Sequence, residues 1–219
     1  MVRPAQSTAR STLQYHLGHP AVRALMEQDE DLRALIEQVG EVSVDIDSDG
    51  YLSLARAICD QQISGTVATA IWGRFEALCS GKVTAEAVAG FDEEALRSVG
   101  FSRMKARYQL DLARHVTEGL LDFEELAALD DEEIIERLIA VKGVGRWTAQ
   151  MYLIFSLERE DVFATADGGL RRSVALLKGI PVDAPAALIE ALAEDWAPYR
   201  TIASLYLWRG LGQGALQSL

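Results

Sequence analysis

A helical pattern that breaks at two closely spaced glycines constrains this chain more than any other feature. Residues 138–149 read Leu-Ile-Ala-Val-Lys-Gly-Val-Gly-Arg-Trp-Thr-Ala, so a helix ends, a turn contains Gly143 and Gly145, and a second helix begins near Arg146. Because glycine has no Cβ, the backbone amides of such a turn can approach a ligand closely. The start of the second helix carries the positive end of its dipole, which suits a phosphate. The alternative interpretation is a simple connection between two helices with glycine at the bend.

A lone carboxylate follows this turn along the chain. Asp167 precedes Gly168 and Gly169 at the predicted start of a later helix. An Asp at that place is commonly an N-cap residue, whose side chain accepts a hydrogen bond from the first helical turn. The positive end of the helix dipole favours the ionised carboxylate. A fixed negative charge can stabilise a cation that forms during a reaction, so capping and catalysis are compatible interpretations.

Helical periodicity dominates the remaining sequence, and strand patterns are almost absent. Residues 41–50 alternate in polarity, which we interpret as an extended link closed by Gly50 rather than a strand. Residues 1–13 lack the apolar core of a signal peptide and are predicted to form a disordered arm. We predict helices at residues 19–26, 31–39, 52–62, 64–79, 84–89, 92–99, 103–117, 123–129, 130–140, 146–157, 168–177, 185–196 and 199–211.

The net charge fits phosphate binding poorly. The chain has 21 basic and 33 acidic residues, a net charge of −12, whereas proteins that bind nucleic acid usually carry a basic surface. Acidic residues concentrate at 27–41, 122–136 and 183–195, and basic residues at 103–107, 142–146 and 171–172. We therefore expect a segregated surface with one basic face.

Cysteine content and hydropathy exclude two classes of protein. Cys59 and Cys79 are too few for an iron–sulfur cluster, which takes four cysteine ligands, and we expect both to be reduced core thiols. No apolar run approaches the ~20 residues that cross a bilayer, so we expect no membrane partner.

The hairpin and Asp167 resemble the helix-hairpin-helix DNA glycosylases with a Gly/Pro-rich loop and a required Asp (the HhH-GPD superfamily). The resemblance is strongest to the alkylated-base, 3-methyladenine branch. It implies an all-α fold of two helical lobes with an active-site cleft between them, one lobe from residues 51–166 and the other from 14–50 with 167–219. The segments that carry it, besides the hairpin and Asp167, are residues 57–58, 61–64, 100–102, Lys105, 196–200 and Trp208.

The resemblance implies a monofunctional glycosylase of base-excision repair. Such an enzyme flips an alkylated purine, of the 3-methyladenine or 7-methylguanine type, out of duplex DNA and hydrolyses its N-glycosidic bond. Asp167 matches the required Asp. A glycosylase for a deaminated or oxidised base and a non-catalytic damage-binding protein are the alternatives. We expect a monomer with double-stranded DNA as its partner, located in the cytoplasm at the nucleoid if the protein is bacterial.

The resemblance also assigns the remaining site residues. Trp147 stands where relatives that cut the DNA strand have a nucleophilic Lys, and a cationic base would stack well on its ring. Trp147 and Trp208 as ordinary core aromatics are the alternative. The predicted base pocket contains Trp147, Trp208, Met151 and Tyr152. The predicted DNA contacts are Gly143, Gly145, Arg146, Lys142, Thr148, Ser102, Arg103 and Lys105.

The resemblance makes two further assignments. One concerns the residue that fills the gap left by a flipped base, and the other concerns the ligands of a bound ion. Gln62 or Ile63 would fill the gap, although the glutamines can equally satisfy a helix junction. The main-chain carbonyls of Ile139, Val141 and Val144 would hold a Na⁺ or K⁺ ion at the hairpin. No cofactor is required for the implied catalysis, and no iron–sulfur cluster is expected.

Overall fold

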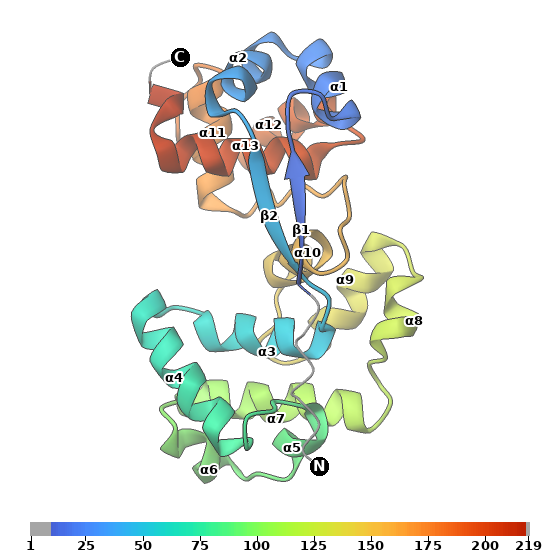
Figure 1. Cartoon of the computed structure of the whole chain (residues 1–219), viewed down its shortest axis with the longest axis vertical. Coiled ribbons are helices and arrows are strands. Elements are labelled where there is room, and N and C mark those ends of the chain that lie inside the picture. The colour runs from blue at the N-terminus through green and yellow to red at the C-terminus, as the bar shows by residue number, and fades with distance from the viewer. Residues whose placement is uncertain (1–9, 218–219) are drawn as a thin grey trace. The chain divides into compact units, whose positions relative to one another are not determined.

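The computed structural model describes residues 10–217, and their contacts divide the chain into two compact units (Figure 1). Asp47–Tyr152 forms the body of the first unit, and the second joins Arg10–Ile46 to Leu153–Leu219. The sequence placed the boundaries near residues 50 and 166. Residues 1–9 of the predicted disordered arm lie outside the described residues.

The first unit is built from helices. Its central helix, α7 (Arg103–Thr117), packs against α3, α5 and α6. The buried residues of α7 include Ala106, Gln109 and Leu112, which recur at helical spacing and so lie on one face. The other elements are α3 (Gly50–Asp60), α4 (Gly65–Leu78), α5 (Ala85–Ala89), α6 (Glu93–Ser98), α8 (Phe123–Ala127), α9 (Asp131–Ile139) and most of α10 (Arg146–Phe155).

The second unit surrounds one deeply buried helix. Residues 201–207 of α13 (Arg200–Gln213) are all buried, as expected for a helix that neighbours cover on every side. It packs against α2 and α11, and the hydroxyl of Tyr206 donates a 2.8 Å hydrogen bond to the carbonyl of Tyr15. The other helices are α1 (Pro20–Gln28), α2 (Glu30–Val39), α11 (Gly168–Leu177) and α12 (Ala186–Ala193).

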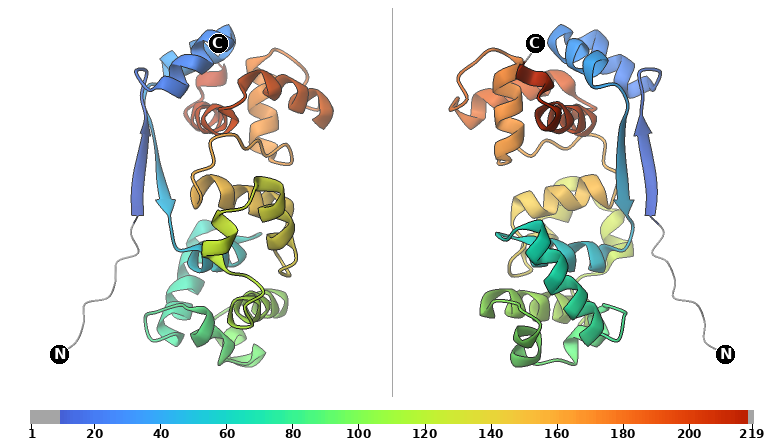
Figure 2. Two further views of the ribbon diagram at one scale, coloured as in Figure 1. Left: turned by 90° about the vertical axis from the view of Figure 1, so that its right-hand side faces the viewer. Right: turned by 60° about the vertical axis from the view of Figure 1, so that its left-hand side comes forward.

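Two strands correct the sequence prediction. β1 (Arg10–Tyr15) and β2 (Val42–Asp47) form a two-stranded sheet, and Figure 2 shows them side by side and running in opposite directions. The prediction of a disordered arm was therefore wrong for residues 10–13, and that of an extended link was wrong for β2. Each strand depends on hydrogen bonds from the other, which the local pattern of either segment does not contain.

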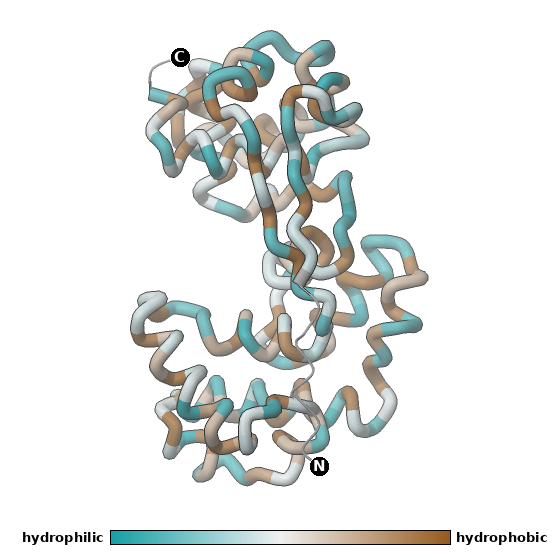
Figure 3. Tube along the Cα trace, in the orientation of Figure 1, coloured by the Kyte–Doolittle hydropathy of each residue, from teal (hydrophilic) through white to brown (hydrophobic). Residues whose placement is uncertain are grey.

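The predicted all-α class is otherwise confirmed. Polar and apolar residues are interspersed along most of the helices, as Figure 3 shows, because these helices bury only part of their surface. Within residues 10–217 no helix is both long enough and apolar enough to span a membrane. Cys59 and Cys79 are buried and carry free thiols.

A buried carboxylate joins three segments of the second unit. Asp29 is the N-cap of α2, where it accepts a hydrogen bond from the amide of Leu32 at 3.1 Å. It also accepts bonds from the indole of Trp196 at 2.7 Å and from Lys178 Nζ at 2.8 Å. Burial alone would raise the pKa of Asp29, but these hydrogen bonds lower it below its usual value.

We predict that Asp29→Asn lowers the free energy of unfolding at pH 7 by about 2 kcal/mol, because Asn preserves the cap but leaves Lys178 without its buried counter-charge. The lowered pKa means that this stabilisation is present above the unfolded pKa of about 4 and is lost as the pH falls. Urea unfolding at pH 7 and at about pH 3 measures both effects. Asp31→Asn is the control, because Asp31 pairs with the same Lys178 but is exposed. An unchanged difference between wild type and Asp29→Asn at the two pH values would contradict the linkage.

Candidate functional site

The predicted hairpin is present between α9 and α10. Asp130 and Glu133 form a capping box that starts α9, and α10 begins at Arg146, directly after Gly145. Gly143 has φ +88°, a left-handed conformation that glycine adopts readily. A Cβ at Gly143 would also lie 2.3 Å from a ring carbon of Tyr108. The turn therefore requires glycine at this position for two independent reasons.

Gly145 differs from Gly143. No positive φ is recorded for it, it is exposed, and a Cβ built on it would meet nothing within 4 Å. The fold of the unit thus gives no reason for glycine at this position. Close approach of a ligand to the amides that open α10 remains a physical reason for it.

A buried carboxylate on α7 holds the hairpin turn. Asp111 Oδ2 accepts a 2.9 Å hydrogen bond from the amide of Lys142, and the Asp111 side chain is only 7% exposed. Burial alone would raise the pKa of Asp111, but the Lys142 amide and the nearby His115 and Arg114 lower it. The sequence analysis missed this residue. The feature of the sequence that could have identified Asp111 is a charged side chain on the buried face of a predicted helix.

The basic residues near the hairpin are paired with carboxylates. Arg146 pairs with Glu132, Arg103 and Arg107 pair with Glu93, and Lys142 Nζ lies 3.6 Å from Asp111. The basic side chains of these pairs are more than half exposed. Exposed ion pairs contribute little stability, so a phosphate can compete with the carboxylates for these cations.

A pocket of about 500 Å³ lies beside the first turn of α10. Trp147 forms one wall and is 43% exposed, so it is not a core aromatic. Met151 also lines the pocket, as the sequence predicted. The lining residues are Ala57, Asp60, Gln61, Gln62, Trp147, Thr148 and Met151.

Two further predicted residues, Tyr152 and Thr148, are buried. Tyr152 is 4% exposed and packs against Phe123 in the core of the first unit, so it does not line this pocket. Burial, with a smaller contribution from Asp49, raises the pKa of Tyr152 to about 12. Thr148, a predicted DNA contact, is also buried and is one of the residues that line the pocket. Thr148 and Tyr152 are four residues apart on α10, so helical periodicity places both on its buried face.

Asp167 is the N-cap of α11, as the sequence predicted. Its Oδ1 accepts a 2.8 Å hydrogen bond from the amide of Leu170 and a 3.1 Å bond from the indole N–H of Trp208. The carboxylate is half-buried. Trp208 stacks on Phe155 with ring centroids 6.1 Å apart, so its indole is fixed on one side by an aromatic ring. The hydrogen bond from Trp208 was not predicted, because it joins residues far apart in the sequence.

Asp161 has a different role. It pairs with Arg200 through both carboxylate oxygens, at 2.8 and 3.0 Å, and so anchors the start of α13. Burial alone would raise the pKa of Asp161, but the hydrogen bonds from Arg200 lower it. The choice of Asp167 over Asp161 as the functional carboxylate is consistent with this arrangement.

The segment between α3 and α4 contains the predicted gap-filling residues. Gln62 is exposed and has φ +55°, whereas Ile63 is half-buried. Gln61 Nε2 donates a 2.9 Å hydrogen bond to the carbonyl of Gly143, so this glutamine does satisfy a helix junction. Lys105, predicted to contact a phosphate, instead donates to the carbonyls of Cys59 and Gln61. Ser102, another predicted contact, caps α7 by accepting from the amide of Lys105 at 3.2 Å.

The predicted cation ligands are main-chain carbonyls of the hairpin. Carbonyl oxygens are hard donors that suit Na⁺ or K⁺, and each has two lone pairs. The carbonyl of Val141 already accepts a 3.1 Å bond from the amide of Val144, which leaves one lone pair for an ion. In the described part of the chain, no group of three or more His, Cys, Asp or Glu side chains is arranged to hold a metal.

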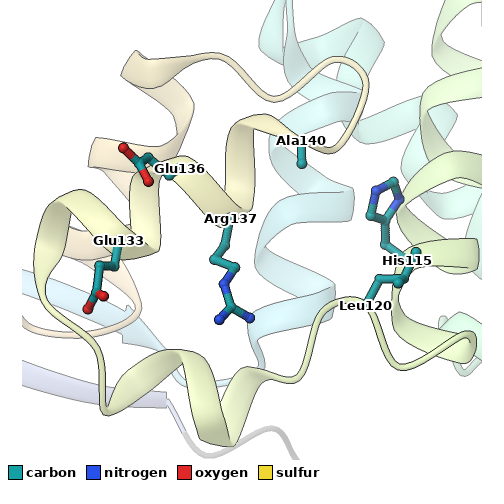
Figure 4. Close-up of a pocket in the computed structure, with 6 residues that line it drawn as sticks. All are labelled: His115, Leu120, Glu133, Glu136, Arg137 and Ala140. Carbon is teal, nitrogen blue, oxygen red and sulfur yellow. The ribbon is translucent and has the colours of Figure 1, made fainter.

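A second cavity in the first unit has a volume of about 420 Å³ (Figure 4). Arg137 and His115, which Figure 4 shows on different helices, border it together with two glutamates. It contains none of the predicted site residues, and its side chains carry both signs of charge, so we assign it no ligand. Its lining is His115, Leu120, Glu133, Glu136, Arg137 and Ala140.

A glycine hairpin between two helices, followed by a capping Asp, defines a helix-hairpin-helix protein of the type that grips a phosphate backbone. Residues 55–198 match the model of the HhH-GPD superfamily base excision DNA repair proteins, and the chain belongs to that family. The matched range contains both the hairpin and Asp167. The family resemblance stated from the sequence is confirmed.

Individual relatives are similar to this chain over most of its length. DNA-3-methyladenine glycosylase 1 of Schizosaccharomyces pombe is 35% identical over 187 residues, which cover 83% of this chain and 82% of that protein. The crystal structure of DNA-3-methyladenine glycosidase from Bacillus halodurans has a TM-score of 0.85 at 37% identity, covering 93% of this chain and 94% of that one. A Schizosaccharomyces pombe 3-methyladenine DNA glycosylase in complex with abasic DNA has a TM-score of 0.75 at 34% identity, covering 87% and 95%.

The two glycines give a test that separates folding from DNA binding. Gly143→Ala is expected to lower the free energy of unfolding by roughly 2 kcal/mol or more, because Ala disfavours the positive φ and collides with Tyr108. Gly145→Ala should change it by less than about 0.5 kcal/mol, yet weaken binding to a DNA duplex, because its Cβ obstructs the amides of α10. Urea unfolding and fluorescence anisotropy measure the two effects. Wild-type affinity in Gly145→Ala would show that phosphate does not approach there.

Proposed function

We propose that the protein is a DNA glycosylase that hydrolyses the N-glycosidic bond of alkylated purines in duplex DNA. The main supporting observation is Asp167, which lies within the matched family range and is a half-buried carboxylate held by the α11 amide and the Trp208 indole. The hairpin supplies the other requirement, a turn with amides suited to the DNA backbone. The names of the relatives support alkylated purines as the substrate class.

The chemistry requires a negative charge near the sugar. Loss of the base builds positive charge on the deoxyribose, as in other glycosyl transfers of oxocarbenium character. An ionised Asp167 stabilises that charge, and it orients or deprotonates the attacking water. The two hydrogen bonds to Oδ1 hold the carboxylate in place before the substrate arrives. Little reorganisation is then needed during the reaction.

The alkylated base explains why one carboxylate suffices. A purine methylated at a ring nitrogen such as N3 or N7 carries a positive charge and leaves the sugar as a neutral molecule, so no strong general acid is required. Trp147, exposed at the wall of the 500 Å³ pocket, offers an electron-rich ring to that cation. Stacking of a base on an aromatic ring contributes roughly 1–3 kcal/mol.

We also propose a cation at the hairpin. The carbonyls of Ile139, Val141 and Val144 would hold Na⁺ or K⁺, which would add positive charge where the DNA phosphate binds. The ion would take part in binding and not in bond cleavage.

Asp167→Asn is predicted to reduce base release by about 100-fold or more, while DNA binding is retained. Asn can still accept the bonds from Leu170 and Trp208, so the variant removes the charge and retains these two hydrogen bonds. The assay incubates the protein with DNA treated with a methylating agent and identifies the released bases by chromatography. Asp161→Asn is the matched control, because Asp161 pairs with Arg200 and should affect stability only. Equal release by Asp167→Asn and wild type would remove Asp167 from the mechanism.

The enzyme is predicted to leave an intact abasic strand. Trp147 stands where strand-cutting relatives have a nucleophilic Lys, and Lys105 is bound to two carbonyls within the protein. No amine is therefore placed to attack C1′ from these positions. Gel electrophoresis before and after alkaline cleavage, with borohydride trapping of any covalent adduct, measures this activity. Strand breaks without alkali, or a trapped adduct, would show that another Lys acts as the nucleophile.

A further inference from the structure

The ammonium group of Lys105 binds the C-terminal end of a neighbouring helix. Lys105 lies in the first turn of α7, and its Nζ donates hydrogen bonds to the carbonyl of Cys59 at 2.7 Å and to that of Gln61 at 2.5 Å. These carbonyls lie at the end of α3, where helical carbonyls lack partners in their own helix and the dipole is negative. Lys105 is half-buried, and burial lowers the pKa of its ammonium group. It is thus built into the protein and is not extended toward solvent.

Gln61 is held from two sides. Its carbonyl accepts the bond from Lys105, and its side-chain amide donates a 2.9 Å bond to the carbonyl of Gly143 in the hairpin turn. Gly143 belongs to the turn that Asp111 fixes through the amide of Lys142. One continuous set of hydrogen bonds therefore connects α7, the end of α3 and the turn that would grip the DNA backbone.

The next residue adopts a conformation that needs this support. Gln62 has φ +55°, in the left-handed region that residues with a side chain rarely occupy. Its side chain is exposed and lines the 500 Å³ pocket together with Trp147. A strained backbone persists only where the neighbouring structure fixes it, and such residues cluster at functional sites.

We propose that Lys105 is a positioning residue, which holds Gln62 in the backbone conformation that directs its side chain into the gap left by a flipped base. The inference rests on the proposed glycosylase function and deepens it. Lys105 touches neither the DNA nor the reacting atoms. It acts through Gln61, whose position it fixes relative to the hairpin turn, so Gln62 is in place when the backbone binds. Loss of the ammonium would leave the end of α3 uncapped and Gln62 in several conformations.

The test compares two substrates that differ in how much gap filling they need. One duplex has 7-methylguanine opposite cytosine, and the other has the same lesion opposite adenine, where flipping costs less because the pair is already broken. Single-turnover release of the base is measured on both. Lys105→Met should slow release at least about tenfold from the paired duplex and much less from the mismatched one. Lys105→Arg should keep most of the wild-type rate on both, because a guanidinium can also donate to two carbonyls.

Lys178→Met is the matched control. Lys178 is another half-buried lysine with two bonded partners, Asp29 and Asp31, and its loss should lower stability without changing the ratio of the two rates. If Lys105→Met does not fold, Gln61→Leu tests the next link in the same set of hydrogen bonds, because it removes the bond to Gly143.

The outcomes separate the two proposals. An equal loss on both duplexes, or no loss on either, would overturn the positioning role while the glycosylase function stands. If the wild-type protein releases 7-methylguanine from neither duplex nor any base from methylated DNA, the proposed function fails, and the role of Lys105 fails with it.

Discussion

The hydrogen bond from the Lys142 amide to the buried carboxylate of Asp111 is the interaction on which the hairpin depends. A turn between two helices has several possible conformations, and each would point its amides in a different direction. Asp111 selects one of them, and Gly143 makes that conformation accessible through its positive φ. Gln61 then bonds to the carbonyl of the same glycine, so the turn is held from both sides. In the proposed function, a phosphate would meet amides that are already oriented, and little ordering cost would remain at binding.

This arrangement explains how a chain with a net charge of −12 can bind DNA. The basic side chains near the hairpin pair with carboxylates, so the local surface contains both signs of charge. Backbone amides carry only partial charges, and these charges do not depend on whether the neighbouring side chains are paired. Binding through amides releases fewer counterions than binding through lysines, so its affinity depends less on salt. In this proposed mode of binding, specific geometry at the turn supplements the positive charge of the paired basic side chains.

Local features of the fold were predictable, whereas features that join distant segments were not. Helical spacing predicted α7 and α10, and Asp167 was recognised as a helix cap because capping involves residues three positions apart. The β1–β2 pair was missed because each strand is stabilised by the other, across more than one intervening helix. Lys105 was predicted as a phosphate contact on the family resemblance. Its carbonyl partners on α3 become visible only when the helices pack.

The same limit explains what the sequence could and could not establish about Asp167, the proposed catalytic carboxylate. Residue type and spacing predicted Asp167 and its cap, but not the indole of Trp208, which bonds to the same oxygen. Two donors on Oδ1 fix the plane of the carboxylate, and Trp208 is fixed in turn by stacking on Phe155. An asparagine can accept from both of these donors, so the two hydrogen bonds do not by themselves require a negative charge at residue 167. Stabilisation of a cationic sugar does require one, and this difference distinguishes a catalytic carboxylate from one that only caps a helix.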